Sequence, residues 1–141
     1  MANTVMTSFK KELMEGTHDL ATSGDTFKLA LYTSSSSINS AATTIYTTSD
    51  EVGNSGTYAA GGGTLAGQTV TTDGTTAICN FDDLEFTSAT ITARFALIYN
   101  SSESNAAVCV LDFSTDQIST AGTFKIDFPA SGASTSIIRV A

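Results

Sequence analysis

The chain has 141 residues, a length that fits one ordinary domain with a single hydrophobic core. Only 14% of the residues are charged, against about 25% in a usual globular protein, and the net charge is −8. The six Lys and Arg residues are scattered apart from the adjacent pair Lys10 and Lys11, so binding to a nucleic-acid backbone is not expected. A surface with so few charges is unusual for a free monomer and favours a protein that is covered by partners.

The N-terminal sequence MANTVMTSFKKELMEG lacks the apolar core of a secretory signal, and no apolar run approaches the roughly 20 residues that cross a bilayer. We therefore expect a protein that is made in the cytoplasm and is not held in a membrane. Cys79 and Cys109 lie in apolar, strand-like segments, so we expect buried free thiols at both positions.

The first predicted element is a helix over about residues 4 to 15. Asn3 or Thr4 can cap its start, and Gly16 occupies the position that commonly follows the end of a helix. So short a helix is marginal in water, and its apolar stripe must pack on something. The stripe consists of Met6, Phe9 and Leu13.

We interpret this helix as a docking element, because the polar stretch from 16 to 25 separates it from the first strand. Residues 1–22 are then an N-terminal helix and linker, and residues 23–141 a single β domain. Packing of the helix against its own sheet remains the alternative.

A strand is predicted over residues 26 to 33, where Phe27, Leu29 and Leu31 alternate with the other face. Residues 34 to 75 are rich in Ser, Thr and Gly, and we expect exposed loops and weak edge strands there, mobile in the isolated protein.

From residue 75 the β pattern becomes regular. A Ser- and Asn-rich turn over 100 to 105 joins two long apolar segments as a hairpin, and Pro129 ends a later strand. With about seven or eight strands and no βαβ spacing, the expected fold is mainly β: an antiparallel β-sandwich or barrel with one N-terminal α-helix. The strands predicted in this part are 76–81, 90–99, 107–113, 124–128 and 136–140.

No catalytic, metal or cofactor site is predicted. His18 is the one histidine, and a solvated or capping role is favoured over that of a catalytic base. The acidic group Asp82, Asp83 and Glu85 lacks the alternating ligands of a calcium loop and is interpreted as a solvated turn. The glycines at 61 to 63 are not followed by the Lys of a phosphate-binding loop. We therefore expect a protein that is not an enzyme and needs no cofactor.

Arg94 and Arg139 each interrupt an apolar strand. They are predicted to form charge-assisted contacts, either with carboxylates such as Asp112 and Asp127 or with a neighbouring subunit. An exposed position on the polar face of the strand remains the alternative for both. The complete set of predicted protein-interface residues is Met6, Phe9, Leu13, Arg94 and Arg139.

Four segments carry a resemblance to a known group of proteins: DTFKLALYT at 25–33, TYAAGGGTL at 57–65, TITARFALIYN at 90–100 and IIRV at 137–140. Over nearly its whole length the chain resembles the small virion structural proteins of tailed bacteriophages, of the head decoration or cement type. The resemblance implies a homotrimer that binds the major capsid protein on the outer surface of the head, in a virion assembled in the host cytoplasm. It supplies no catalytic motif.

Two other functions remain open. The chain could be a tail, adaptor or fibre component of the virion, or a carbohydrate-binding module for the host surface. The second of these needs an exposed aromatic platform, which the absence of Trp and the presence of only four Tyr disfavour.

Overall fold

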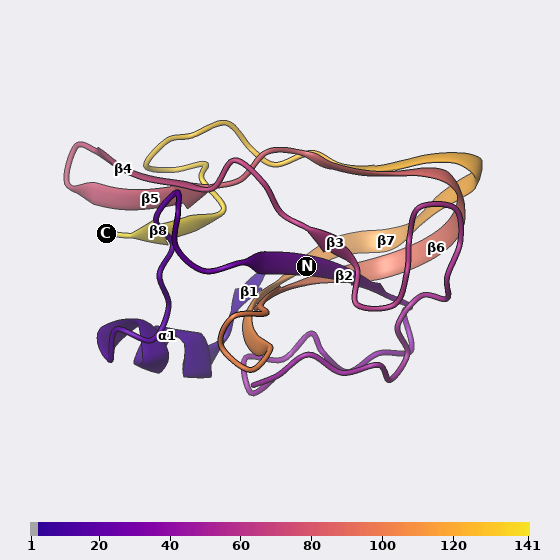
Figure 1. Cartoon of the computed structure of the whole chain (residues 1–141), viewed down its shortest axis with the longest axis horizontal. Helices are drawn as coiled ribbons and strands as arrows, with labels where there is room; N and C mark the ends of the chain where they lie inside the picture. Colours follow the sequence, from indigo (N-terminus) through magenta and orange to yellow (C-terminus); the bar gives the residue numbers. More distant parts are fainter. Residues whose placement is uncertain (1–2) are drawn as a thin grey trace.

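The computed structural model describes residues 3 to 141, which form two antiparallel β-sheets and one short helix (Figure 1). The predicted mainly β, sandwich-like fold class is confirmed. The elements are β1 (Thr4–Val5), α1 (Thr7–Met14), β2 (Phe27–Tyr32), β3 (Gly63–Thr64), β4 (Thr69–Asp73), β5 (Thr76–Asn80), β6 (Leu84–Asn100), β7 (Ala106–Ile126) and β8 (Ile138–Val140). The larger sheet has the strand order β1-β7-β6-β2-β3, and the smaller has the order β4-β5-β8.

The long ribbon of β6 and β7 dominates the molecule. It pairs from Leu84 with Ile126 to Asn100 with Ala106, and its register shifts at several places. Ser114 and Ala121 have positive φ angles of 69° and 45°, as expected at β-bulges, which bend a strand and increase its twist. Figure 1 shows the ribbon bending back at the end of the molecule opposite to β4 and β5. The prediction of separate strands at 107–113 and 124–128 was therefore wrong, since bulges keep residues 107–113 and 124–126 in one 21-residue strand that ends at Ile126.

β2 lies inside the larger sheet, between β6 and β3. Phe27, Leu29 and Leu31 are fully buried, as the alternation predicts. Ala30 and Tyr32 on the other face are also fully buried, because the segment between β2 and β3 packs there and Thr47 accepts a hydrogen bond from the Tyr32 hydroxyl at 2.6 Å.

The N-terminal segment pairs with the larger sheet before it becomes helical. Thr4 and Val5 face Val110 and Cys109 in an antiparallel pair, so α1 begins at Thr7 instead of residue 4. Gly16 has a φ of 74° directly after the C-cap residue, which confirms its predicted role at the helix end.

The segment of residues 33–62 contains no extended strand, but it is not simply exposed loop as predicted. Ile38, Val52 and Tyr58 are buried in the hydrophobic core. That core also takes in side chains from α1 and from both sheets, so the described chain has one continuous hydrophobic core. No helix within residues 3–141 has both the length and the apolar character needed to cross a membrane.

Candidate functional site

The structure places the predicted helix stripe mainly inside the chain. Met6 is fully buried and Phe9 is 1% exposed, and both belong to the common core. The interpretation of these two residues as an intermolecular docking stripe was therefore wrong. The pairing of β1 with β7 holds α1 close to the larger sheet, and the polar stretch from 16 to 25 does not keep the helix apart from it.

The last turn of α1 is different, because it borders an open apolar surface. Leu13 is partly buried, whereas Met14 is 90% exposed. A groove of about 150 Å³ lies between this turn and the smaller sheet. We call it the small-sheet groove; it is lined by Leu13, Leu20, Val70, Ala77, Ile78, Cys79, Ile138 and Val140.

Arg94 and Arg139 have different environments. The Nε of Arg94 donates to Asp112 Oδ1 at 3.0 Å, which confirms the predicted contact with that carboxylate. Arg139 donates to the carbonyl oxygen of Ala133 at 3.2 Å. Asp127 instead pairs with Lys125 at 2.7 Å, so its predicted contact with an arginine was wrong.

Asp112 is buried and ionised in this arrangement. Burial opposes its charge, but the backbone N–H of Ser114 at 2.8 Å and the Arg94 guanidinium outweigh this cost and lower the pKa of its carboxyl. The backbone N–H of Asp112 donates to Asn3 Oδ1, so the same residue also fastens the N-terminal segment to β7.

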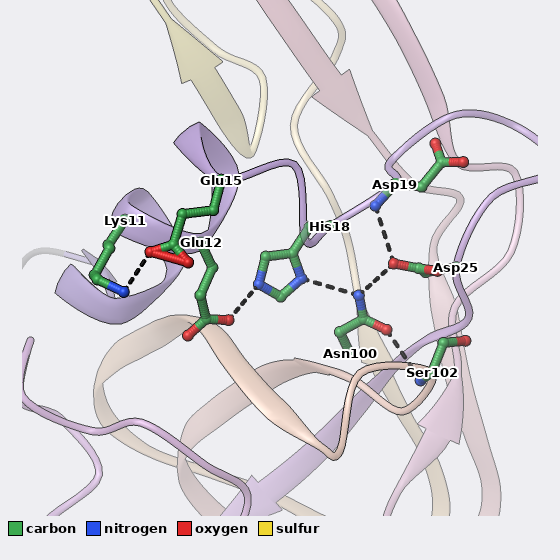
Figure 2. A network of polar contacts seen from close by, with 8 residues as sticks. All are labelled: Lys11, Glu12, Glu15, His18, Asp19, Asp25, Asn100 and Ser102. Carbon is green, nitrogen blue, oxygen red and sulfur yellow. Dashed lines mark hydrogen bonds and ion pairs between the residues drawn. The ribbon is translucent and has the colours of Figure 1, made fainter.

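His18 lies at the centre of a buried polar network that connects three parts of the chain (Figure 2). Its Nε2 is 2.8 Å from Glu12 Oε2 on α1, and its Nδ1 is 2.9 Å from Asn100 Nδ2 at the end of β6. The Phe9 ring packs against the imidazole at a centroid distance of 4.8 Å. The side chain of His18 is 0% exposed, so the prediction of a solvated or capping histidine was wrong.

The hydrogen bonds around Asn100 assign the protons of this network. The Ser102 N–H donates to Asn100 Oδ1 at 3.0 Å, which orients the amide so that Nδ2 donates to His18 Nδ1 and to Asp25 Oδ2. His18 is then the neutral tautomer whose Nε2–H donates to Glu12. Both ring nitrogens are engaged and enclosed, so the imidazole has no free nitrogen with which to accept a proton from a substrate.

A second polar cluster surrounds Glu51 in the segment between β2 and β3. Its carboxylate accepts hydrogen bonds from the hydroxyls of Tyr46 and Tyr58 at 2.6 and 2.7 Å, and from the Gly61 N–H at 2.7 Å. Tyr99 on β6 stacks on Tyr46 and donates to the Gly61 carbonyl. Burial is the main cause that raises the pKa of these tyrosine hydroxyls, to about 12 for Tyr99. Glu51 thus draws parts of the long segment together, while Tyr58, whose hydroxyl accepts the Leu31 N–H at 2.9 Å, and Tyr99 link the segment to the larger sheet.

The acidic turn is also used structurally. Asp83 accepts the Phe128 N–H at 2.8 Å and lies 3.4 Å from Lys125 Nζ; the first of these contacts is the main cause that lowers the pKa of its carboxyl. No group of three or more His, Cys, Asp and Glu side chains within residues 3–141 is placed to hold a metal ion. Cys79 and Cys109 are buried free thiols, as predicted.

A larger groove follows the bent β7. It has a volume of about 490 Å³, and Ile118 beside it is 68% exposed. Its lining combines charged with aromatic side chains, and aromatic residues are enriched at protein–protein contact surfaces. We call it the β7 groove; its lining includes Phe113, Ile118, Phe124, Lys125, Asp127 and Phe128.

The predicted interface residues are not brought together at one site, and neither groove was predicted from the sequence. Ile118 stands in a polar stretch without regular alternation, and the small-sheet groove combines residues from α1 with residues from β4 and β8. Comparison of the chain with protein-family models, curated protein sequences and solved structures finds no match.

Proposed function

We propose that this chain is a virion structural protein: a capsid decoration protein that binds the outer surface of the major capsid protein lattice of a tailed bacteriophage. The observation that carries this proposal is the exposure of large apolar side chains on a surface that is poor in charge. Met14, Ile118 and Val140 are 90%, 68% and 52% exposed. Such side chains on a protein with 14% charged residues suit contact with other proteins.

The few basic side chains support the same proposal, because several are engaged within the chain. Lys11 pairs with Glu15, Arg94 with Asp112, and Lys125 with Asp83 and Asp127. Little positive charge is left to attract nucleic acid, while the net charge stays at −8. The resemblance to decoration proteins is the basis for proposing the major capsid protein as the partner.

Binding of such a protein stabilises the capsid by mass action. A ligand that binds only the assembled lattice stabilises that lattice, by an amount that grows with the ratio of the free ligand concentration to its dissociation constant. We assign the attachment to the β7 groove, whose lining combines the exposed Ile118 with the charged side chains of Lys125 and Asp127.

Quantitative mass spectrometry of purified particles tests the proposal. A decoration protein is expected at a copy number close to that of the major capsid protein. A copy number far below it would instead identify a tail, adaptor or fibre component, and complete absence from particles would refute both.

The surface is tested separately with Ile118→Asp, which should abolish binding to particles that lack the protein. Ile45→Asp is the matched control, because Ile45 is also exposed, at 53%, but lies outside the β7 groove. Equal loss of binding in both variants would contradict the assignment of the groove.

A further inference from the structure

We propose that β4 is a self-complementary edge through which two copies of this chain join their smaller sheets into one six-stranded sheet. The inference does not depend on the proposed function, since it concerns the purified chain alone. It starts from the exposure of β4: all five of its residues, Thr69 to Asp73, are exposed.

β4 has one partner strand and one free side. In the order β4-β5-β8 it pairs with β5 alone, so its other edge is open. The β4–β5 hairpin stands at the end of the molecule opposite to the bend of the β6–β7 ribbon (Figure 1). Its edge contains no Pro, Lys or Arg, the residues with which proteins commonly prevent strand addition.

The register of the hairpin tells which backbone groups point outward. Asp73 and Thr76 flank the two-residue turn and so exchange both of their backbone hydrogen bonds. Along an antiparallel pair of strands, hydrogen-bonded residue pairs alternate with pairs that are not hydrogen-bonded. Thr69 and Thr71 therefore also direct their backbone N–H and C=O groups at β5. Val70 and Thr72 therefore direct their N–H and C=O groups to the open side.

Two copies of this edge fit each other. An antiparallel pair centred on Thr71 places Val70 opposite Thr72 of the partner subunit, so that the outward backbone groups of both residues exchange hydrogen bonds. Thr71 then faces Thr71 of the partner subunit, and threonine pairs across strands are favourable. Asp73 faces Thr69 of the partner subunit, and no like charges stand opposite each other.

The negative charge of the chain does not prevent this contact. In the centred register, Asp73 and Asp73 of the partner subunit are four residues apart along the strands, or about 13 Å. That separation exceeds the Debye length of about 8 Å at physiological ionic strength, so their repulsion is largely screened. Because each chain carries a net charge of −8, association should weaken as salt is removed.

The pairing also extends an apolar surface. Val70, Ala77 and Val140 share one face of the smaller sheet by register, and Val70 is 49% exposed. In the six-stranded sheet Val70 packs beside Thr72 of the partner subunit, and the small-sheet grooves of both copies lie on the same face of that sheet. Other free edges are less suitable. β7 is interrupted by positive φ angles at Ser114 and Ala121, and β8 has only three residues, with Arg139 at its centre.

Sedimentation equilibrium of the full chain over a range of concentrations tests the proposal. We expect a monomer–dimer equilibrium whose dissociation constant rises as salt is lowered. Val70→Lys should weaken dimerisation by at least about tenfold. Val140→Lys is the matched control, because Val140 is similarly exposed on the same face but belongs to the opposite edge strand, and it should dimerise like the wild type.

Thr72→Pro gives a second test that spares the monomer. Proline lacks a backbone N–H, and the N–H of residue 72 is one that points to the open side. The β4–β5 pairing therefore keeps its hydrogen bonds, while the intermolecular strand pair loses two hydrogen bonds, one from each copy. Thr72→Ala retains the N–H and should still dimerise. Circular dichroism of every variant checks that the fold is kept.

Hydrogen exchange supplies the residue-level result. The amides of Val70 and Thr72 should become protected as concentration rises, while that of Thr71 is protected at all concentrations. A chain that stays monomeric up to about 1 mM, a trimer, or equal weakening by Val70→Lys and Val140→Lys would each overturn the proposal.

Discussion

Asn100 is the residue on which the His18 network depends. Its Nδ2 group donates to two acceptors at once, His18 Nδ1 and Asp25 Oδ2, and it lies in a fully buried position. The bond between His18 and Asn100 thus holds the N-terminal part of the chain against the end of the ribbon.

Asn100→Asp should therefore destabilise the protein, because an acceptor would replace the donor and face two other acceptors. The expected loss is about 1–3 kcal/mol in the free energy of unfolding, measured by urea denaturation at neutral pH. Asn54→Asp is the control, since Asn54 uses only its Oδ1 atom, which accepts the Ala60 N–H at 2.8 Å and survives in aspartate. Similar losses in both variants would show that the added charge, and not the lost donor, is responsible.

Asp112 should make stability depend on pH in the acid range. Because its pKa is lowered in the folded state, the stability that it contributes is present above about pH 4, the ordinary pKa of Asp, and is lost as pH falls through the lower folded value. Asp112→Asn should remove this part of the acid dependence. The measurement is the free energy of unfolding of the variant and of the wild type at several pH values from 5 down to 2.

The exposed Asp116 provides the comparison for this measurement. Asp116→Asn should keep the acid dependence of the wild type. If the two variants give the same pH profile, the ion pair of Asp112 with Arg94 does not contribute as described.

The contacts of single residues were predictable from the sequence only in part. Arg94 and Asp112 could be linked because each is a charged residue inside an apolar strand, and such a residue needs a partner of opposite charge. His18 gave no comparable signal, since its partner Asn100 is 82 residues away and an asparagine at a strand end usually indicates only a turn.

α1 shows how a correct element can be given a wrong role. Its position and its C-terminal Gly16 follow from local signals, but its packing partner is set by the strand β1 that precedes it. Two residues are too short a pattern to predict a strand, so the sequence left the helix without a visible attachment to the sheet.

Phe9→Ala should consequently destabilise the whole domain. Truncation of a buried Phe removes apolar contact and leaves a cavity, at a cost of about 3–5 kcal/mol, visible as a lower midpoint in urea or heat denaturation. Met14→Ala on the same helix should change the free energy of unfolding by no more than about 0.5 kcal/mol, because Met14 is 90% exposed. Unchanged stability in Phe9→Ala would restore the helix as a separate docking element.

The segment between β2 and β3 was the least predictable element. Its composition indicates loops, and composition carries no information on the three donors that converge on the Glu51 carboxylate. Those donors come from residues five to ten positions away along the chain, without a helical or strand period.

Glu51→Gln should loosen this segment. One carboxylate oxygen becomes an amide group that cannot accept the tyrosine or backbone hydrogen, at a cost of about 1–3 kcal/mol. Hydrogen exchange should accelerate mainly in residues 45 to 62. Glu85→Gln removes the same charge from an exposed position of β6 and should leave exchange in the segment unchanged. Equal exchange in both variants would contradict the anchoring role of Glu51.

For the molecule as a whole, the shared core predicts sensitivity to alkali. Burial raises the pKa of Cys79 to about 11 and the pKa of Cys109 to about 12. The stability linked to these groups is complete below the ordinary thiol pKa of about 8.5 and is lost as pH rises through 11 to 12. The free energy of unfolding should therefore fall as pH rises from 8 to 12, and it should not depend on these thiols near neutral pH.

The double variant Cys79→Ala, Cys109→Ala isolates the thiol contribution. Its stability should stay level until about pH 10, where the tyrosines of the Glu51 cluster, Tyr46, Tyr58 and Tyr99, begin to contribute through their own raised pKa values. A decline that begins at the same pH in the variant and in the wild type would show that the thiols do not take part.

The pairing of β1 with β7 has a consequence for the order in which the protein is made. Asn3 and Asp112, which are joined by a hydrogen bond, stand 109 residues apart, so Asn3 is translated long before the strand against which it is placed. The β6–β7 hairpin closes through a short turn and can form in microseconds, whereas long-range docking is slow. On a nascent chain Met6 and Phe9 are therefore uncovered throughout translation of the segment that precedes β7. Their apolar side chains are a natural binding site for chaperones during this interval.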